Sequence, residues 1–346
     1  HIMKKITSIF ALLLCVFVFS CSNDDDKETS SLQIVSSNVT FESAGGTGTI
    51  KVNAISEITA TSNKDWCTVS VNGDIINVSV IENNDMSGRT AAVTITDGEA
   101  STLVPVSQGG CVILYNKSES GHAFTYAGGS ATVSFSTTAS YSIEVPAEAQ
   151  SWLSYTLDEE NRTITFNVAA SADKTPRGAA VKVTAGKKTI YYHLGEYELK
   201  DIAGKWRVSF VDGDDSTLAG EIEVVQDEEE PTIFYLSGIS NFFDLPLIYN
   251  GEALLTMGGL NLGTYAGRYN IYTVTLSEGG YVSWDMSTQY VAYPSSINGK
   301  FALVFGDNGS WDGDVVNGIA YWAFSGAAGT GSAGWLEKFN ALTLSK

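Results

Sequence analysis

Aromatic side chains are concentrated in the last part of the sequence, where they could bind carbohydrate. Residues 200–346 contain 22 of the 38 Phe, Trp and Tyr residues and five of the seven Trp. Flat rings stack on the apolar faces of sugars, and Trp and Tyr add a polar group at an exposed rim. We expect ligand contacts from Trp311, Trp335, Tyr290 and Tyr293. The alternative for each ring is the hydrophobic core, which takes many aromatic residues of β-proteins.

Two acidic loops, residues 212–215 and 307–314, bring carboxylates and carbonyls together as calcium requires. Neither loop has the spacing of an EF-hand, and polar hairpin turns explain both, so the sequence predicts no metal and no cofactor. His122 and His193 have no nucleophile or metal partner at a recognisable spacing. The sequence therefore predicts a protein that is not an enzyme. A close carboxylate pair in a cleft would instead favour glycoside hydrolysis.

The elements that must position these side chains are short strands. Residues 49–54, 76–80 and 163–168 alternate apolar and polar side chains, and turn residues separate such runs. This period of two is typical of half-buried β-strands, and no long stretch has apolar residues at helical spacing. The sequence predicts an all-β protein.

One pattern occurs twice in the chain. Residues 41–46 and 124–129 both read Phe-x-x-Ala-Gly-Gly, and each copy continues to a Trp and then to an Arg-x-Ala-Ala-Val segment. A repeat of this length is one domain written twice, because a shorter unit could not bury its own apolar face. We expect two tandem immunoglobulin-like β-sandwiches, at 33–110 and 111–198, followed by a third domain at 199–346.

Both copies resemble the BACON domain, a module associated with Bacteroidetes. The resemblance rests on the Phe-x-x-Ala-Gly-Gly entry, the central Trp66 and the segment before a Val/Ile-Thr strand, and the closing Val-Ser-Gln-Gly of the first copy fits as well. The second copy departs from the pattern, with His193-Leu-Gly at its end. The resemblance implies a role in carbohydrate binding for an adjoining enzyme or for mucin. Such sandwiches can also serve as spacers, which Trp66 and Trp152 favour if they fill the two cores.

The third domain begins with Gly204-Lys-Trp206, which resembles the Gly-x-Trp of the first strand in lipocalin-type barrels. The resemblance implies an antiparallel β-barrel with Trp206 as a structural plug at one end. A two-sheet sandwich is the alternative. Within this domain we expect Trp284 and Trp322 to face the interior, because both lie in strand-like sequence.

The N-terminus indicates export. Residues 1–20 have the charged start and short apolar run of a signal peptide. The segment ending at Cys21 resembles a bacterial lipobox, which implies a lipid on Cys21 and an acidic tether at 21–32. An acidic run after the lipidated cysteine is similar to the surface-export signal of Bacteroidetes lipoproteins. These features predict an outer-membrane lipoprotein that is exposed on the cell surface and contacts the membrane only through its lipid.

Charge and cysteine content limit the partners. The formal net charge of −19 repels nucleic acid and anionic membranes. Cys67 and Cys111 could pair in an exported protein, but we expect two separate thiols. The sequence predicts non-catalytic binding of a glycan, either a polysaccharide or a mucin-type chain, with the sandwiches as spacers or accessory binders. The alternatives are an adhesion protein with a protein partner and a lipocalin-like binder of a small molecule.

Overall fold

The computed structural model describes residues 32–98 and 100–346, and β-strands dominate them. The predicted all-β class is therefore confirmed. The predicted signal peptide, Cys21 and the tether up to residue 31 lie outside the described residues. Within the described part of the chain, no helix has the length and apolar character needed to cross a membrane.

The first domain, sandwich 1, packs two four-stranded sheets face to face, in the orders β1-β3-β6-β5 and β2-β8-β7-β4. Its core follows from the alternation of side chains along each strand. In β3, Ile50 and Val52 point inward, while the alternate residues Thr49 and Lys51 are exposed. The strands are β1 (Gln33–Asn38), β2 (Thr40–Phe41), β3 (Gly46–Asn53), β4 (Thr59–Ser62), β5 (Cys67–Asn72), β6 (Ile75–Val80), β7 (Arg89–Thr96) and β8 (Ser101–Gln108).

The second domain, sandwich 2, repeats this arrangement with the sheets β13-β14-β11-β9 and β10-β16-β15-β12. The shared Ala-Gly-Gly turn has a steric reason. Gly45 and Gly128 have φ of 81° and 72°, and a side chain on either would overlap a carbonyl, that of Val80 or Val168. The elements are β9 (Ile113–Tyr115), η1 (Lys117–Glu119), β10 (Gly121–Phe124), β11 (Gly129–Thr137), β12 (Tyr141–Glu144), η2 (Ala147–Ala149), β13 (Leu153–Asp158), β14 (Thr163–Val168), β15 (Arg177–Ala185) and β16 (Lys188–Glu196).

The third domain is a closed barrel with an extension. Neighbouring strands pair in the order β17-β18-β19-β20-β21-β25-β26-β28, and β28 pairs again with β17, so the path returns to its start. The extension is built from β22, β23, β24 and β27 against residues 332–340 of β28. The elements are η3 (Leu199–Asp201), β17 (Gly204–Val211), β18 (Thr217–Gln226), β19 (Ile233–Ser237), β20 (Leu245–Tyr249), β21 (Leu254–Met257), β22 (Asn261–Tyr265), β23 (Tyr269–Ser277), β24 (Val282–Ser283), β25 (Gln289–Ile297), β26 (Lys300–Asp307), β27 (Val316–Phe324) and β28 (Ser332–Ser345).

Side chains fill the barrel. Phe234 and Leu236 are fully buried in its core, and Trp206 is 2% exposed, with its indole N–H donating to the Ile202 carbonyl at 2.7 Å. The burial of Trp206 agrees with a structural residue, while its place at one end of the barrel stays a prediction. A packed interior of this kind argues against the small-molecule cup, which needs an open lumen.

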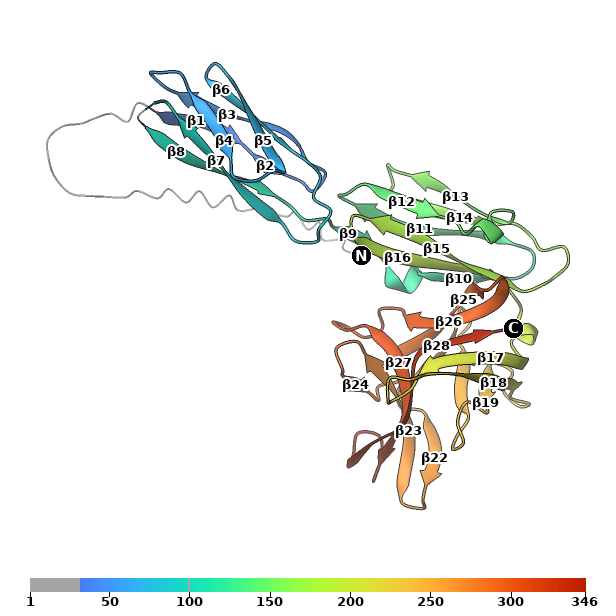
Figure 1. The fold of residues 1–346 in the computed structure, drawn as a ribbon. Helices are drawn as coiled ribbons and strands as arrows, with labels where there is room; N and C mark the ends of the chain where they lie inside the picture. Colours follow the sequence, from blue (N-terminus) through green and yellow to red (C-terminus); the bar gives the residue numbers. More distant parts are fainter. Residues whose placement is uncertain (1–31, 99) are drawn as a thin grey trace, which may run out of the picture.

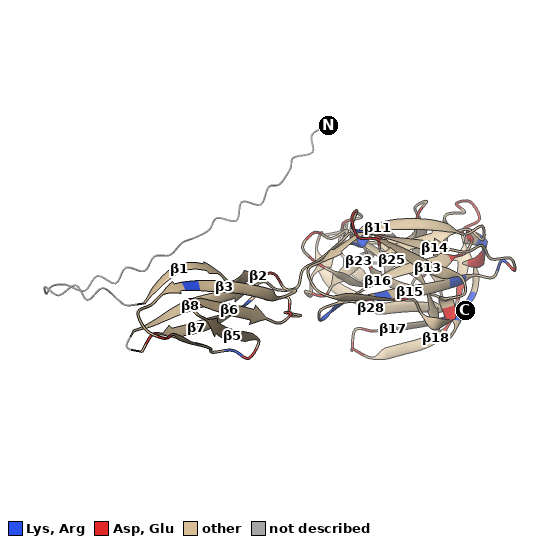
Figure 2. Cartoon of the chain, turned by 90° about the horizontal axis from the view of Figure 1, so that it is seen from above, with Lys and Arg blue, Asp and Glu red and all other residues tan. Residues whose placement is uncertain are grey.

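Sandwich 2 and the barrel are docked closely, whereas sandwich 1 touches sandwich 2 mainly at one end. Strand β25 lies against β10, β15 and β16 (Figure 1). A Cβ on Gly178 would lie 2.5 Å from the Ser295 nitrogen, and one on Gly195 would overlap Pro294. Figure 2 shows sandwich 1 extending away from the body that the other two domains form. The departures of the second copy from the BACON pattern therefore lie where the barrel docks.

Cys67 and Cys111 are both buried and free, in agreement with the expectation of two separate thiols. Trp66 and Trp152 were expected to fill the two sandwich cores, and this holds for only one of them. Trp152 is buried, but Trp66 is only half-buried. In both copies an arginine covers the ring: Arg89 lies 4.4 Å from the centroid of Trp66, and Arg177 lies 4.7 Å from that of Trp152.

Candidate functional site

A cleft lies along the junction of sandwich 2 and the barrel, and we call it the interdomain cleft. It consists of two hollows of about 240 Å³ and 380 Å³ that share Lys117 and Val315. Domain junctions are preferred places for ligand sites. The side chains that give the cleft its chemistry are Tyr115, Lys117, Tyr191, His193, Tyr293, Asp307, Glu278, Trp311, Asp312 and Asp314.

An ion pair joins the two walls of the cleft. The short helix η1, capped by the Asn116 side chain, places Lys117 with its ammonium 2.7 Å from Oδ2 of Asp307 on β26. Burial alone would lower the pKa of the Lys117 ammonium, but the hydrogen bond and the charge of Asp307 outweigh it and raise that pKa. The ammonium is therefore charged at neutral pH. The Lys117 side chain is 36% exposed, so its ammonium can still donate a hydrogen bond to a ligand.

A hydrogen-bonded loop holds Trp311 in the second hollow. The Asn308 amide donates to Gln289 at 2.9 Å, and the Gln289 N–H donates to the Ser310 hydroxyl at 2.8 Å, so the loop is tied to β25. The Trp311 ring packs partly on the barrel core. Beside it, the N–H of Val315 lowers the pKa of the Asp314 carboxyl, which is therefore ionised at neutral pH.

Aromatic rings line the first hollow. His193 on β16 stacks on Tyr293 of β25 with centroids 5.0 Å apart, and Tyr191 on the same strand as His193 is 49% exposed. Burial lowers the pKa of His193 to about 4, and its Nδ1 has no hydrogen-bond partner among the described residues. The imidazole is thus neutral at pH 7, and the ring surface that the hollow offers to a ligand is mainly that of the exposed Tyr191.

The neutral state of His193 predicts a pH-dependent stability. Between about pH 6.5 and pH 4 the unfolded chain binds a proton at this residue and the folded chain does not, so the free energy of unfolding falls as the pH falls through this window. We expect a loss on the order of 2–3 kcal/mol relative to the variant His193→Phe. Urea unfolding at pH 7.0 and pH 4.5 measures it, and equal losses for both proteins would contradict the prediction.

The structure brings together two of the four predicted ligand residues. Trp311 and Tyr293 both line the interdomain cleft, although Tyr293 is 7% exposed and offers only an edge of its ring. Trp335 is 45% exposed as expected, but it lies outside the cleft, on Gly213 and beneath the Lys338 ammonium. Tyr290 requires a correction. It is 1% exposed, and its hydroxyl bonds to Asn317 and Leu342 inside the barrel, so it cannot stack on a ligand.

A second correction concerns Trp284, which was expected to face the interior and is 44% exposed. It lies just after β24, outside a paired strand, and packs edge to face on Phe324. Trp322 is half-buried, with its N–H on Ser332. Sequence reasoning also missed the contribution of sandwich 2 to the cleft, Tyr115, Lys117 and Tyr191. Gly178 and Gly195 replace larger residues of the first copy, and this could have indicated that another domain covers this face of sandwich 2.

Two polar side chains of the cleft are already held by neighbours. Asp307 is held by Lys117, and the one histidine of the cleft is neutral and stacked. No group of three or more His, Cys, Asp or Glu side chains placed to hold a metal occurs in residues 32–98 and 100–346. The arrangement can present rings, hydroxyl acceptors and an ammonium to a polar ligand.

Comparison with known families agrees with the repeat architecture. Residues 56–109 and 139–191 match the BACON family, described as "Putative binding domain, N-terminal". The two sandwiches are BACON-like. Both matches end at the last strand of a sandwich, and the barrel lies beyond the second BACON match.

The chain is also similar to a xyloglucan-specific endo-beta-1,4-glucanase of Bacteroides ovatus, with 28% identity over 107 residues. The match covers 29% of this chain and 21% of that enzyme, so the chain spans about a fifth of the relative it matches. Among solved structures, the GH5 xyloglucanase of Bacteroides ovatus in complex with a XXXG heptasaccharide is 26% identical over 23% of this chain and 19% of that chain, with a TM-score of 0.22. The I9-I11 tandem from titin is 7% identical over 79% of this chain and 94% of that chain, with a TM-score of 0.33.

Proposed function

We propose that this protein binds carbohydrate without catalysis, and that the interdomain cleft is its main site. The observation that carries the proposal is Trp311, a partly exposed ring fixed by a hydrogen-bonded loop beside Asp312, Asp314 and Lys117. Such a ring can stack on a sugar, and the charged groups can bond to its hydroxyls. Because the loop is already ordered, binding loses little conformational entropy.

Charge narrows the class of carbohydrate. The chain has a formal net charge of −19, and the second hollow contains Glu278, Asp312 and Asp314 against the single cation Lys117. A polyanionic glycan would be repelled, so a neutral polysaccharide fits better than a sialylated or sulfated mucin chain. The BACON matches and the similarity to a xyloglucanase support a neutral plant polysaccharide such as xyloglucan as the first ligand to test.

The proposal includes a place in the cell. A lipid on Cys21 would tether the chain to the outer membrane, and the acidic tether would lead to the outside of the cell. Sandwich 1 then acts as a spacer that carries the cleft away from the membrane. Labelling of the lipoprotein with a fatty-acid probe, and its loss in Cys21→Ala, tests the anchor.

Removal of the Trp311 ring tests the binding site. Burial of an aromatic face is worth about 1.5–3 kcal/mol, so Trp311→Ala should weaken the affinity for a neutral polysaccharide about 10- to 100-fold. Isothermal titration calorimetry of the full chain measures this loss. Trp335→Ala is the matched control, because its ring is exposed on the same domain but outside the cleft.

The outcomes separate the proposed site from its alternatives. Unchanged affinity in a folded Trp311→Ala protein would exclude the cleft, and a loss in Trp335→Ala alone would move the site to that ring. Failure of the wild-type chain to bind any neutral polysaccharide would overturn the proposed function and favour adhesion to a protein.

A further inference from the structure

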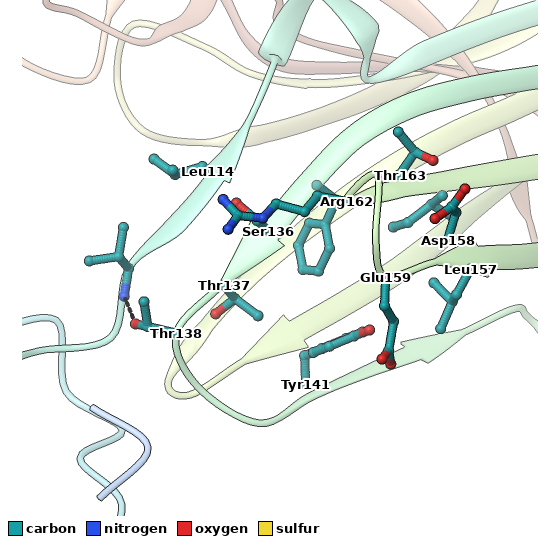
Figure 3. A pocket seen from close by; sticks show the side chains of 13 residues that line it. Leu114, Ser136, Thr137, Thr138, Tyr141, Leu157, Asp158, Glu159, Arg162 and Thr163 are labelled. Atoms are coloured by element: carbon teal, nitrogen blue, oxygen red, sulfur yellow. Dashed lines mark hydrogen bonds between the residues drawn. The ribbon is translucent and has the colours of Figure 1, made fainter. Parts of the chain in front are cut away.

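A groove of about 450 Å³ opens at one end of sandwich 2, on the far side of β9 from the interdomain cleft. Consecutive residues of a strand point to opposite faces, so Leu114 lines the groove while Tyr115 lines the cleft. No residue lines both. Figure 3 shows the groove, with Glu159 reaching toward Tyr141 and Arg162 toward Ser136.

The corresponding end of sandwich 1 can be compared with this groove residue by residue, because the two domains are copies of one pattern. In sandwich 1 the Val52 N–H donates to the Asp74 carbonyl at 2.9 Å, and in sandwich 2 the Phe135 N–H donates to the Arg162 carbonyl at 2.9 Å. The repeated bond shows which residues correspond. Phe135 takes the place of Val52, and Arg162 takes the place of Asp74.

Strand register identifies a third exchange. Thr59 faces Thr96 in sandwich 1, and Ser142 faces Thr184 in sandwich 2, so the preceding residues, Ile58 and Tyr141, correspond. Ile58 is 7% exposed and closes the end of its core, whereas Tyr141 is 38% exposed. Phe135 packs edge to face against Tyr141, with centroids 5.3 Å apart, and fixes that ring at the opening.

The hairpin over this end also differs between the copies. Two residues connect β5 to β6 in sandwich 1, and four connect β13 to β14 in sandwich 2. The longer hairpin ends at Arg162, which has a φ of 56° although it is not glycine. Strained backbone of this kind persists where the surrounding structure enforces it, and it is concentrated at binding sites.

Two charged groups at the rim are free to bind a ligand. The Arg162 guanidinium and the Glu159 carboxylate make no hydrogen bond or ion pair within the described residues. The Asp158 carboxylate, in contrast, accepts two hydrogen bonds within the hairpin, from the side-chain amide of Asn161 at 2.7 Å and from its backbone N–H at 2.9 Å. In sandwich 1 the corresponding Asp74 pairs with Lys51 at 3.7 Å. At this position sandwich 1 thus has a charged side chain in an ion pair, and sandwich 2 has one without a partner among the described residues.

We propose that this groove is a second saccharide site, separate from the interdomain cleft, and that its ligand is a neutral sugar. Tyr141 supplies a ring face, while Arg162, Glu159 and Thr137 supply donors and acceptors for hydroxyl groups. The lining has two acids, Asp158 and Glu159, against the one cation Arg162, so an anionic sugar is disfavoured. The open, mixed lining does not suit a purely apolar ligand.

Amide-resolved NMR titration of the full chain tests the site. The probes are neutral hexaoses of glucose, mannose and xylose, added to the Trp311→Ala protein so that the cleft contributes little. We expect at least one hexaose to shift the amides of Thr137, Tyr141 and Arg162. Tyr141→Ala and Arg162→Gly should each weaken the affinity at least tenfold, and glycine also relieves the positive φ, so this variant folds.

The matched control is Asp74→Gly at the corresponding hairpin of sandwich 1, which should leave the titration unchanged. No shift at the groove with any hexaose would overturn the proposal, whatever happens at the cleft. Stronger shifts with an oligogalacturonate than with its neutral counterparts would overturn the choice of a neutral ligand. Binding lost in Trp311→Ala but intact in Arg162→Gly would leave only the cleft as a site.

Discussion

The variant Arg177→Leu should lower the free energy of unfolding by about 3–5 kcal/mol, because it leaves a buried carboxylate without its partner. Nε and Nη2 of Arg177 both contact Oε2 of Glu196, which is fully buried. The other carboxylate oxygen, Oε1, has no partner among the described residues. Urea unfolding at pH 7 measures the loss.

The first copy supplies a matched control for this experiment. Arg89 occupies the same place, over Trp66, but its partner is the neutral amide of Gln108 at 2.8 Å. Arg89→Leu should cost only about 1–3 kcal/mol, since no charge is left buried. Equal losses in the two variants would contradict the argument. The double variant Arg177→Leu, Glu196→Leu should recover most of the stability, because it removes the charge together with its partner.

Replacement of Gly178 by Val should separate the barrel from sandwich 2. A Cβ at this position would lie within 2.9 Å of three backbone atoms of Pro294 and Ser295, so β25 must move away. Over-packing of this kind costs about 1–3 kcal/mol, and it also displaces the Lys117–Asp307 pair that spans the junction. We expect the joint unfolding of the two domains to split into two transitions, and the affinity of the cleft for carbohydrate to fall.

Thr90→Val is the control, since Thr90 is the exposed counterpart of Gly178 in sandwich 1 and should change stability by no more than about 0.5 kcal/mol. Small-angle scattering distinguishes a docked body from two domains on a linker. An unaltered scattering curve and a single transition for Gly178→Val would show that the junction tolerates a side chain there.

Much of the fold could be predicted from the sequence, because the signals for strands and for repeated domains are local. Alternation identified strands, the repeat identified two domains of one kind, and Trp206 marked a buried position at the start of the barrel. These inferences need only residues close together in the chain. The free, buried state of Cys67 and Cys111 also agrees with the analysis of the sequence.

The site was harder to predict, because it is made by contacts between domains. Lys117 and Asp307 are 190 residues apart in the chain, and no local pattern pairs them. Trp284 was misplaced because it lies just after β24, outside a paired strand. Tyr290 was misplaced for a reason related to that of the cleft. Alternation tells which residues share a face of a strand, but the closure of β28 on β17 decides which face becomes the barrel interior. Only the composition of loop 307–314 around Trp311 was visible in advance.

The closing pair of strands also determines the order in which the chain can fold. Val208 on β17 pairs with Leu344 on β28, so the barrel cannot close until the chain up to residue 344 is available for pairing. Each sandwich pairs strands only within its own segment and can be complete much earlier. Until then β17 and β26 remain open edges, each able to pair with another chain. Barrel closure should therefore be the slow and aggregation-sensitive step of biogenesis, set by contact order and not by the stability of the finished protein.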